Sequence, residues 1–208
     1  MVKVKICGIT SLEDALYAAE AGADALGFVF WEKSPRYIEP MEAWRIKRSL
    51  PPFILTVGVF VNTPFDTLKT VISSTRIDCV QLHGDESPRM CQSVGESTGK
   101  KVIKAFRIRE HTDIDRLDGY KVDAHLLDTY REGTPGGTGE TFDWDLAVEA
   151  KKNRRIILSG GLTPENISKA IKLVRPYAVD VSSGVESRPG KKDPEKIKRF
   201  MEQIRHTN

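Results

Sequence analysis

Two short stretches near the C-terminus, Ile156-Ile157-Leu158-Ser159-Gly160-Gly161 and Ala178-Val179-Asp180-Val181-Ser182-Ser183-Gly184, decide the fold. Each is an apolar run, rich in β-branched residues, that ends in small residues with accessible backbone N–H groups, as buried parallel strands do. In a barrel of parallel strands, the loops after the seventh and eighth strands commonly hold a phosphate through backbone amides and a helix N-terminus. We therefore predict a phosphate-binding site formed by Gly160, Gly161, Ser182, Ser183 and Gly184.

The rest of the chain repeats one unit, an apolar strand followed by a polar cap and an amphipathic helix. Strands are expected at 2–9, 23–30, 53–61, 79–83, 102–108, 124–129, 155–159 and 178–181. Eight such units in 208 residues average about 26 residues each, which is close to the minimum for a (β/α)8 barrel. Because the composition does not change along the chain, we predict a single α/β domain over residues 1–208, a TIM barrel.

Helix starts are marked by capping residues. Thr10-Ser11-Leu12-Glu13 is a capping-box sequence that predicts a helix through Ala21, and a second helix is expected from Pro40 to Leu50. Elsewhere a side-chain acceptor precedes a proline, which has no N–H to lose at the first helical position. These pairs are Thr63-Pro64, Ser87-Pro88, Thr163-Pro164 and Asp193-Pro194, and each predicts the start of a helix.

A doubly wound open sheet would produce the same alternation of strands and helices. It is disfavoured because no G-x-G-x-x-G sequence follows the first strand. The glycine-dense segment 133–139 is not followed by Lys-Ser or Lys-Thr, so it is not a nucleotide-binding P-loop either. This segment follows the sixth strand, where it is either a lid over the barrel mouth or a flexible connector.

Composition excludes several classes of function. The 32 basic and 29 acidic residues leave a net charge of +3, which disfavours binding to nucleic acid. Three scattered cysteines, Cys7, Cys79 and Cys91, do not form a disulfide framework, so we expect a reducing compartment. The first residues contain no apolar run, so we expect neither a signal peptide nor a membrane span, and a cytoplasmic location.

In a barrel, catalytic side chains lie at the C-terminal ends of the strands. Cys7 ends the first strand, and it is either a buried apolar residue of the core or, if its pKa is lowered, a base or nucleophile. Asp128 ends the sixth strand, and it is either an acid or a carboxylate that braces a loop.

Two further side chains lie in loops at the same rim. Arg36, in Ser34-Pro35-Arg36 after the second strand, is either a clamp for a carboxylate or phosphate or an ordinary surface charge. The histidines share no metal-ligand spacing, so no metal site is expected, and His83 after Gln81 is interpreted as a loop-bracing residue. Lys191-Lys192 is interpreted as a solvated approach to the last helix.

Short motifs spread over the whole chain resemble those of one known family. They include Lys5-Ile6-Cys7-Gly8-Ile9-Thr10, Gly27-Phe28-Val29-Phe30, Ser34-Pro35-Arg36, Val57-Gly58-Val59-Phe60-Val61-Asn62, Gln81-Leu82-His83-Gly84, Leu127-Asp128-Thr129, Gly136-Gly137-Thr138-Gly139, Leu158-Ser159-Gly160-Gly161-Leu162, Val179-Asp180-Val181-Ser182-Ser183-Gly184-Val185-Glu186 and Pro189-Gly190-Lys191-Lys192-Asp193. As a set they resemble the phosphoribosylanthranilate isomerase family of tryptophan biosynthesis.

This resemblance implies an Amadori rearrangement that needs no cofactor and no metal. By position, Asp128 matches the family's general acid, Cys7 its general base and Arg36 the residue that holds the anthranilate carboxylate. The glycines and serines of the two C-terminal stretches match its phosphate site. Asp180 is assigned a substrate-hydroxyl or supporting role, and His83 is placed with the substrate-binding residues. The implied partner is a small phosphorylated substrate, and the sequence leaves a monomer and a homodimer open.

Two other functions are compatible with the same fold. One is another phosphosugar isomerase or epimerase, such as the related histidine-pathway isomerase, whose acid and base are both aspartates. Cys7 in place of an aspartate and Arg36 argue against it. The other is a non-catalytic barrel that binds a phosphorylated ligand, against which the combination of Cys7, Asp128 and Arg36 argues.

Overall fold

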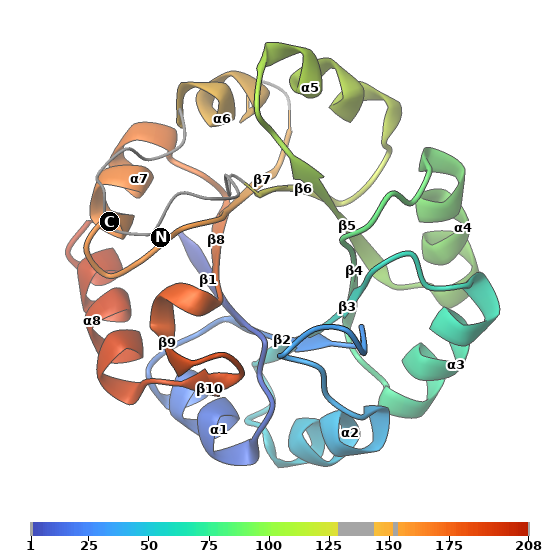
Figure 1. The fold of residues 1–208 in the computed structure, drawn as a ribbon, viewed down its shortest axis with the longest axis horizontal. Helices are drawn as coiled ribbons and strands as arrows, with labels where there is room; N and C mark the ends of the chain where they lie inside the picture. The colour runs from blue at the N-terminus through green and yellow to red at the C-terminus, as the bar shows by residue number, and fades with distance from the viewer. Residues whose placement is uncertain (1, 129–143, 152–153, 208) are drawn as a thin grey trace.

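A computed structural model describes residues 2–128, 144–151 and 154–207 of the chain. Its strands β1 to β8 form a closed barrel in which each strand pairs with the next along the chain and β8 pairs with β1. All these pairings are parallel, and the helices surround the ring of strands (Figure 1). The predicted (β/α)8 barrel is confirmed.

The strands lie within or close to the predicted ranges. They are β1 Lys3–Cys7, β2 Ala25–Val29, β3 Leu55–Phe60, β4 Cys79–Leu82, β5 Lys101–Arg107, β6 Ala124–Asp128, β7 Ile156–Ser159 and β8 Ala178–Val181. The first three are shorter than predicted. Ile9 and Phe30 lie beyond the ends of β1 and β2 and stay in the core, whereas Phe53, two residues before β3, is exposed.

The helices are α1 Leu12–Glu20, α2 Pro40–Ser49, α3 Phe65–Thr75, α4 Pro88–Thr98, α5 His111–Asp115, α6 Trp144–Ala150, α7 Ile167–Val174 and α8 Pro194–Arg205, with 3-10 turns η1 at Arg116–Gly119 and η3 at Ser183–Val185. Between β8 and α8 the chain forms an antiparallel hairpin of β9, Glu186–Arg188, and β10, Lys191–Lys192. The sequence did not predict this hairpin. Within the described parts of the chain, no helix is both long and apolar enough to span a bilayer.

Two of the predicted caps are confirmed. Ser87 accepts a hydrogen bond from the Met90 N–H at the start of α4, where Pro88 is the first helical residue. Asp193 likewise accepts from the N–H groups of Glu195 and Lys196 at the start of α8.

The other caps differ from the prediction. The cap of α1 is Ser11, which accepts from the Asp14 N–H, whereas the Thr10 hydroxyl donates to the Gly190 carbonyl of the hairpin. Thr63 does not cap α3, whose N-cap is Pro64 without a side-chain hydrogen bond. Thr163 starts a turn, and α7 begins only at Ile167.

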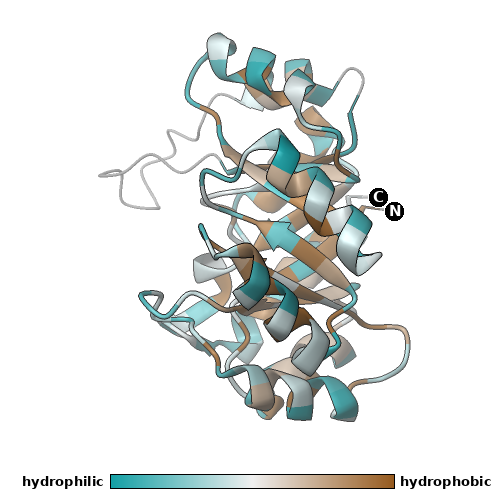
Figure 2. Ribbon diagram, turned by 90° about the vertical axis from the view of Figure 1, so that its right-hand side faces the viewer, coloured by the Kyte–Doolittle hydropathy of each residue, from teal (hydrophilic) through white to brown (hydrophobic). Residues whose placement is uncertain are grey.

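Two apolar layers give the barrel its rigidity. Alternate residues of each strand point outward and pack against the helices, forming the large core that includes Phe28, Phe60 and Phe200. The inward-pointing residues form a separate cluster of Val57, Ile103, Ala105, Ala124, Leu126, Ile157 and Ala178. In Figure 2 the strands are mostly brown, and teal segments are found mainly on the surrounding helices and loops. The barrel interior is therefore packed rather than open.

A buried ion pair ties the loop after β4 to the barrel wall. The Lys104 ammonium lies 3.2 Å from the Glu86 carboxylate, and both side chains are 3% exposed. Glu86 also accepts hydrogen bonds from the backbone N–H groups of Asn62 and Gly84. Lys104 donates in addition to the backbone carbonyls of Leu82, Gly84 and Ala105. These contacts fix the backbone on both sides of His83.

We expect Lys104→Met to lower the free energy of unfolding by about 3–5 kcal/mol, because it leaves the Glu86 carboxylate buried without its cation. Urea unfolding followed by circular dichroism measures this loss. Arg45→Met is the matched control, since Arg45 and Glu42 form an exposed pair on α2 that contributes about 0.5 kcal/mol or less. Equal losses in the two variants would contradict a structural role for the buried pair.

Candidate active site

The predicted catalytic and binding residues meet at one rim of the barrel. Cys7 is the last residue of β1, Asp128 is the last of β6, and Asp180 lies in β8. His83 directly follows β4, and Arg36 lies in the loop between β2 and α2. Because all eight strands are parallel, their C-terminal ends form one ring, so these side chains face a common mouth.

Cys7 lies above a buried ion pair. The Lys5 ammonium donates to Asp180 at 2.9 Å, and these two side chains are 5% and 4% exposed. Lys5 and Cys7 point to the same face of β1, where both pack over Gly27. A Cβ added at Gly27 would lie 2.6 Å from the Cys7 sulfur and 3.1 Å from the Lys5 side chain. Residues two apart on a strand share a face, so this partner of Cys7 could have been identified from the sequence.

Burial raises the pKa of the Cys7 thiol. The Lys5 ammonium opposes this rise in pKa, and the Asp180 carboxylate adds to it. Burial also disfavours a charged Lys5, but Asp180 and Cys7 keep the pKa of Lys5 above its usual value. Lys5 is therefore a fixed positive charge beside the sulfur.

Asp128 and His83 are neighbours across the mouth. The His83 Nε2 lies 3.3 Å from the Asp128 Oδ2, and the Gln81 amide nitrogen donates to the His83 Nδ1 at 2.9 Å. The His83 ring therefore lies between the Gln81 amide and the Asp128 carboxylate. Gln81 is fully buried on the inner face of β4, so it fixes the orientation of the ring.

Arg36 is held by a residue that the sequence reasoning missed. Its Nε and Nη2 donate to the two oxygens of Glu186 at 2.8 and 2.7 Å. Lys192 donates to the same carboxylate at 2.9 Å. Although burial opposes ionisation, the hydrogen bond from Arg36 and the charge of Lys192 lower the pKa of Glu186. Burial lowers the pKa of Lys192, and the Glu186 charge opposes this.

The interpretation of Lys191-Lys192 as a solvated segment was wrong for Lys192, whereas the Lys191 side chain is 36% exposed. The Lys192 side chain is 1% exposed, because β10 turns it inward against Glu186. Lys191 pairs with Asp14 and Glu13 of α1 at 2.8 and 2.7 Å. Lysine side chains usually remain in water, and the burial of Lys192 follows from its place in the hairpin.

The predicted phosphate-binding residues lie side by side after β7 and β8. Gly160 and Gly161 have φ values of +84° and +64°, a left-handed conformation that suits glycine. The backbone at Gly184 approaches the Leu162 carbonyl so closely that a Cβ would not fit. The Ser182 hydroxyl is buried without a hydrogen-bond partner among the described residues, and η3 begins at Ser183.

The segment 133–139, predicted as a lid or a connector, lies outside the described residues. Among the described residues, no group of three or more potential ligands is arranged to hold a metal ion.

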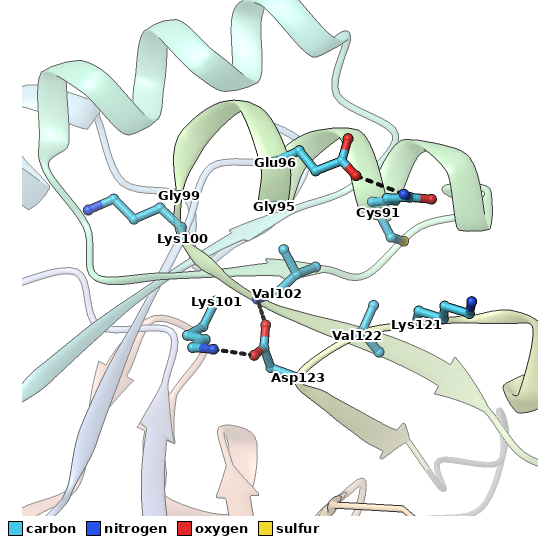
Figure 3. A pocket seen from close by; sticks show the side chains of 11 residues that line it. Cys91, Gly95, Glu96, Gly99, Lys100, Lys101, Val102, Lys121, Val122 and Asp123 are labelled. Carbon is cyan, nitrogen blue, oxygen red and sulfur yellow. Dashed lines mark hydrogen bonds and ion pairs between the residues drawn. The ribbon is translucent and has the colours of Figure 1, made fainter.

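A surface pocket of about 530 Å³ lies at the other end of the barrel (Figure 3). Its lining includes Gly99 and Lys100 after α4, Lys101 at the start of β5, and Asp123 just before β6. Asp123 pairs with Lys101 at 2.8 Å and accepts from the Val102 N–H at 2.9 Å. Because it lies at the N-terminal ends of the strands, this pocket is separate from the rim that carries Cys7 and Asp128.

Comparison with known proteins decides the family. The family model described as N-(5'-phosphoribosyl)anthranilate (PRA) isomerase matches residues 4–203. The chain belongs to the PRA isomerase family. An N-(5'-phosphoribosyl)anthranilate isomerase of Citrifermentans bemidjiense is 58% identical over 201 residues, covering 97% of this chain and 96% of that protein.

Solved structures of PRA isomerases have the same fold. One, in complex with reduced 1-(o-carboxyphenylamino)-1-deoxyribulose 5-phosphate, has a TM-score of 0.89 and 47% identity and covers 99% of this chain and 100% of that chain. Another, described as monomers of a dimeric PRA isomerase from Thermotoga maritima, has a TM-score of 0.88 and 46% identity, with coverage of 99% and 100%.

We expect Lys5→Met to raise the pKa of Cys7 further, because it removes the ammonium that opposes the effect of burial. Asp180→Asn should lower the same pKa, since it removes a negative charge beside the sulfur. Ultraviolet absorbance of the thiolate, taken as the difference between each protein and its Cys7→Ser variant, measures both values. Shifts in the same direction for the two variants would contradict this electrostatic arrangement.

Proposed function

We propose that this protein converts N-(5′-phosphoribosyl)anthranilate to 1-(2-carboxyphenylamino)-1-deoxyribulose 5-phosphate by an Amadori rearrangement. The observation that carries the proposal is the meeting of Cys7, Asp128 and Arg36 at one barrel rim, in a chain of the PRA isomerase family. A thiol, a carboxyl group and a guanidinium supply the base, the acid and the carboxylate clamp that this substrate needs.

Asp128 acts first, as the general acid. It donates a proton to the ring oxygen of the ribose while the C1′–O bond breaks and the nitrogen lone pair forms a C1′=N double bond. Asp128 is then a carboxylate, and the His83 Nε2 lies 3.3 Å from its Oδ2.

Cys7 acts second, as the general base. The C=N⁺ group acidifies the neighbouring C2′–H, and the thiolate takes this proton while the bonding electrons move to neutralise the iminium. The enolamine that results becomes the keto product by proton transfer from oxygen to carbon. Lys5 stabilises the thiolate. Asp180 keeps Lys5 charged and in place, and this is the supporting role that we assign to Asp180.

Two sets of binding groups at the mouth hold the two ends of the substrate. The amides at Gly160, Gly161, Ser183 and Gly184, with the Ser182 hydroxyl, receive the phosphate. Arg36 receives the anthranilate carboxylate. Fixing both ends places C1′ and C2′ between the acid and the base, and such orientation contributes much of the rate acceleration in enzymes.

We expect Cys7→Ala and Asp128→Asn each to lower kcat by about 10²–10⁴-fold, because each removes one proton-transfer group. Loss of anthranilate-ribotide fluorescence measures turnover. Cys79→Ser is the matched control, since the hydroxyl preserves the hydrogen bond to the Lys101 carbonyl at the far end of the barrel. Near-normal turnover in either active-site variant would show that its role is assigned wrongly.

The rival functions give different results in the same assay. A histidine-pathway isomerase would turn over the imidazole-carboxamide ribotide substrate and not the anthranilate ribotide. A non-catalytic barrel would bind the phosphorylated compound without turnover.

We also propose a cytoplasmic location and a homodimer. The described cysteines are free thiols, as expected in a reducing compartment. Phe53, in the loop between α2 and β3, is 93% exposed, and Leu55 nearby is 55% exposed. Two exposed apolar side chains this close in sequence, one of them aromatic, suit a contact surface. A second copy of the chain fits it, since a related isomerase is described as dimeric.

We expect Phe53→Ser to convert a dimer to a monomer without lowering kcat, because Phe53 is at the N-terminal side of the barrel and the active site is at the other. Analytical ultracentrifugation measures the mass of both proteins. A wild-type protein that sediments as a monomer at micromolar concentration would contradict the homodimer.

A further inference from the structure

We propose that Glu186 is a positioning residue that makes the enzyme selective for a carboxylate on the substrate's aromatic ring. Glu186 holds one edge of the Arg36 guanidinium, so that the opposite edge is presented to the substrate, and Lys192 balances the charge of Glu186. The inference rests on the proposed function, in which Arg36 binds the anthranilate carboxylate.

The donors of Arg36 divide into two sets. A guanidinium has five N–H donors in a planar arrangement. Glu186 takes the Nε donor and one donor of Nη2, at 2.8 and 2.7 Å. Both donors of Nη1 and the second donor of Nη2 remain on the other edge. This edge can bind a second carboxylate through two parallel hydrogen bonds.

Glu186 is itself fixed. Its side chain is 4% exposed, and its Oε1 accepts from both Arg36 and Lys192. A buried carboxylate without a cation costs several kcal/mol, so Glu186 keeps Arg36 beside it. The two cations and one carboxylate have a net charge of +1. That charge suits an anionic group of the substrate, which an isolated Arg36–Glu186 pair with zero net charge would not attract.

The hairpin of β9 and β10 brings Glu186 and Lys192 together. These two residues are partners in its antiparallel register. Its Lys192 N–H donates to Asp14 of α1 at 3.1 Å, and its Gly190 carbonyl accepts from Thr10 at 2.5 Å. The hairpin is therefore anchored to the loop after β1 and to α1.

The stem of Arg36 is fixed as well. Gly8, with a φ of +77°, lies under it, and a Cβ added at Gly8 would be 2.6 Å from the Arg36 Cδ. At the hairpin tip, a Cβ added at Gly190 would lie 2.7 Å from the Pro35 carbonyl oxygen, so the hairpin also packs on the Arg36 loop. The stem and the guanidinium of Arg36 are therefore both held in place. The guanidinium edge that does not contact Glu186 is preorganised to bind a carboxylate.

The experiment measures Glu186→Gln against two substrates, the anthranilate ribotide and the aniline ribotide that lacks the carboxylate. Glutamine keeps the shape but loses the charge and one acceptor for Arg36. We expect kcat/KM for the anthranilate ribotide to fall about 10–100-fold, mainly through KM, and kcat/KM for the aniline ribotide to change less than about threefold. Equal losses for the two substrates, or no loss, would overturn the proposal.

Two controls show that the effect passes through Arg36. In an Arg36→Met background, Glu186→Gln should cause no further loss, because the side chain that it positions is gone. Glu165→Gln is the matched surface control, since Glu165 pairs with Arg199 where both side chains are more than half exposed. If Glu186→Gln does not fold, Glu186→Asp tests the same point. Aspartate keeps the charge, but its shorter side chain does not reach both Nε and Nη2 of Arg36, so the same selectivity should be lost.

Equilibrium binding separates this inference from the proposed function. Calorimetry with the reduced product analogue and its decarboxy counterpart measures the carboxylate contribution in wild type and Glu186→Gln without turnover. The role of Glu186 is supported if wild type binds the carboxylate analogue at least tenfold more tightly and the variant loses this preference. This holds even if no turnover is found. Equal binding of the two analogues by wild type would refute it even if turnover is found.

Discussion

Closure of the barrel with every strand in the same direction is the constraint on which the site depends. The ring from β1 through β8 and back to β1 places all the C-terminal strand ends in one circle. Cys7 and Asp128 are 121 positions apart in the chain, and only this closure gives them a common mouth. The apolar layer below them, which includes Leu126 and Ile157, prevents the ring from collapsing or opening.

Above this layer the interior is polar, and its buried charges are paired. Lys5 is paired with Asp180, and Glu186 lies between Arg36 and Lys192. Buried charges are expensive to keep unless they are paired, so they are found where function requires them. On the Cys7 side of the mouth, the Lys5 ammonium opposes the rise that burial causes in the pKa of the thiol. On the other side, His83 lies beside Asp128.

The sequence predicted what depends on local patterns. Strand runs, helix caps at Ser87 and Asp193, and polar residues at strand ends all follow from neighbours within a few positions. It did not predict the β9–β10 hairpin or the partner of Arg36, because Arg36 and Glu186 are separated by 150 positions. The burial of Lys192 was missed for the same reason, because it depends on a contact with Asp14, which is 178 positions away in the sequence. Lys5 beside Cys7 and Gln81 beside His83 could have been found from strand alternation.

We propose that the phosphate-binding residues after β7 and β8 hold the phosphate, that Arg36 holds the carboxylate, and that the reacting carbons lie between Cys7 and Asp128. A crystal structure of this protein with reduced 1-(o-carboxyphenylamino)-1-deoxyribulose 5-phosphate tests it most directly. We predict the phosphate within hydrogen-bond distance of the amides at Gly161 and Gly184, and the carboxylate on the free edge of Arg36. A ligand bound in the opposite orientation, or with its C1–C2 bond away from the Cys7 sulfur and the Asp128 carboxylate, would contradict this binding mode.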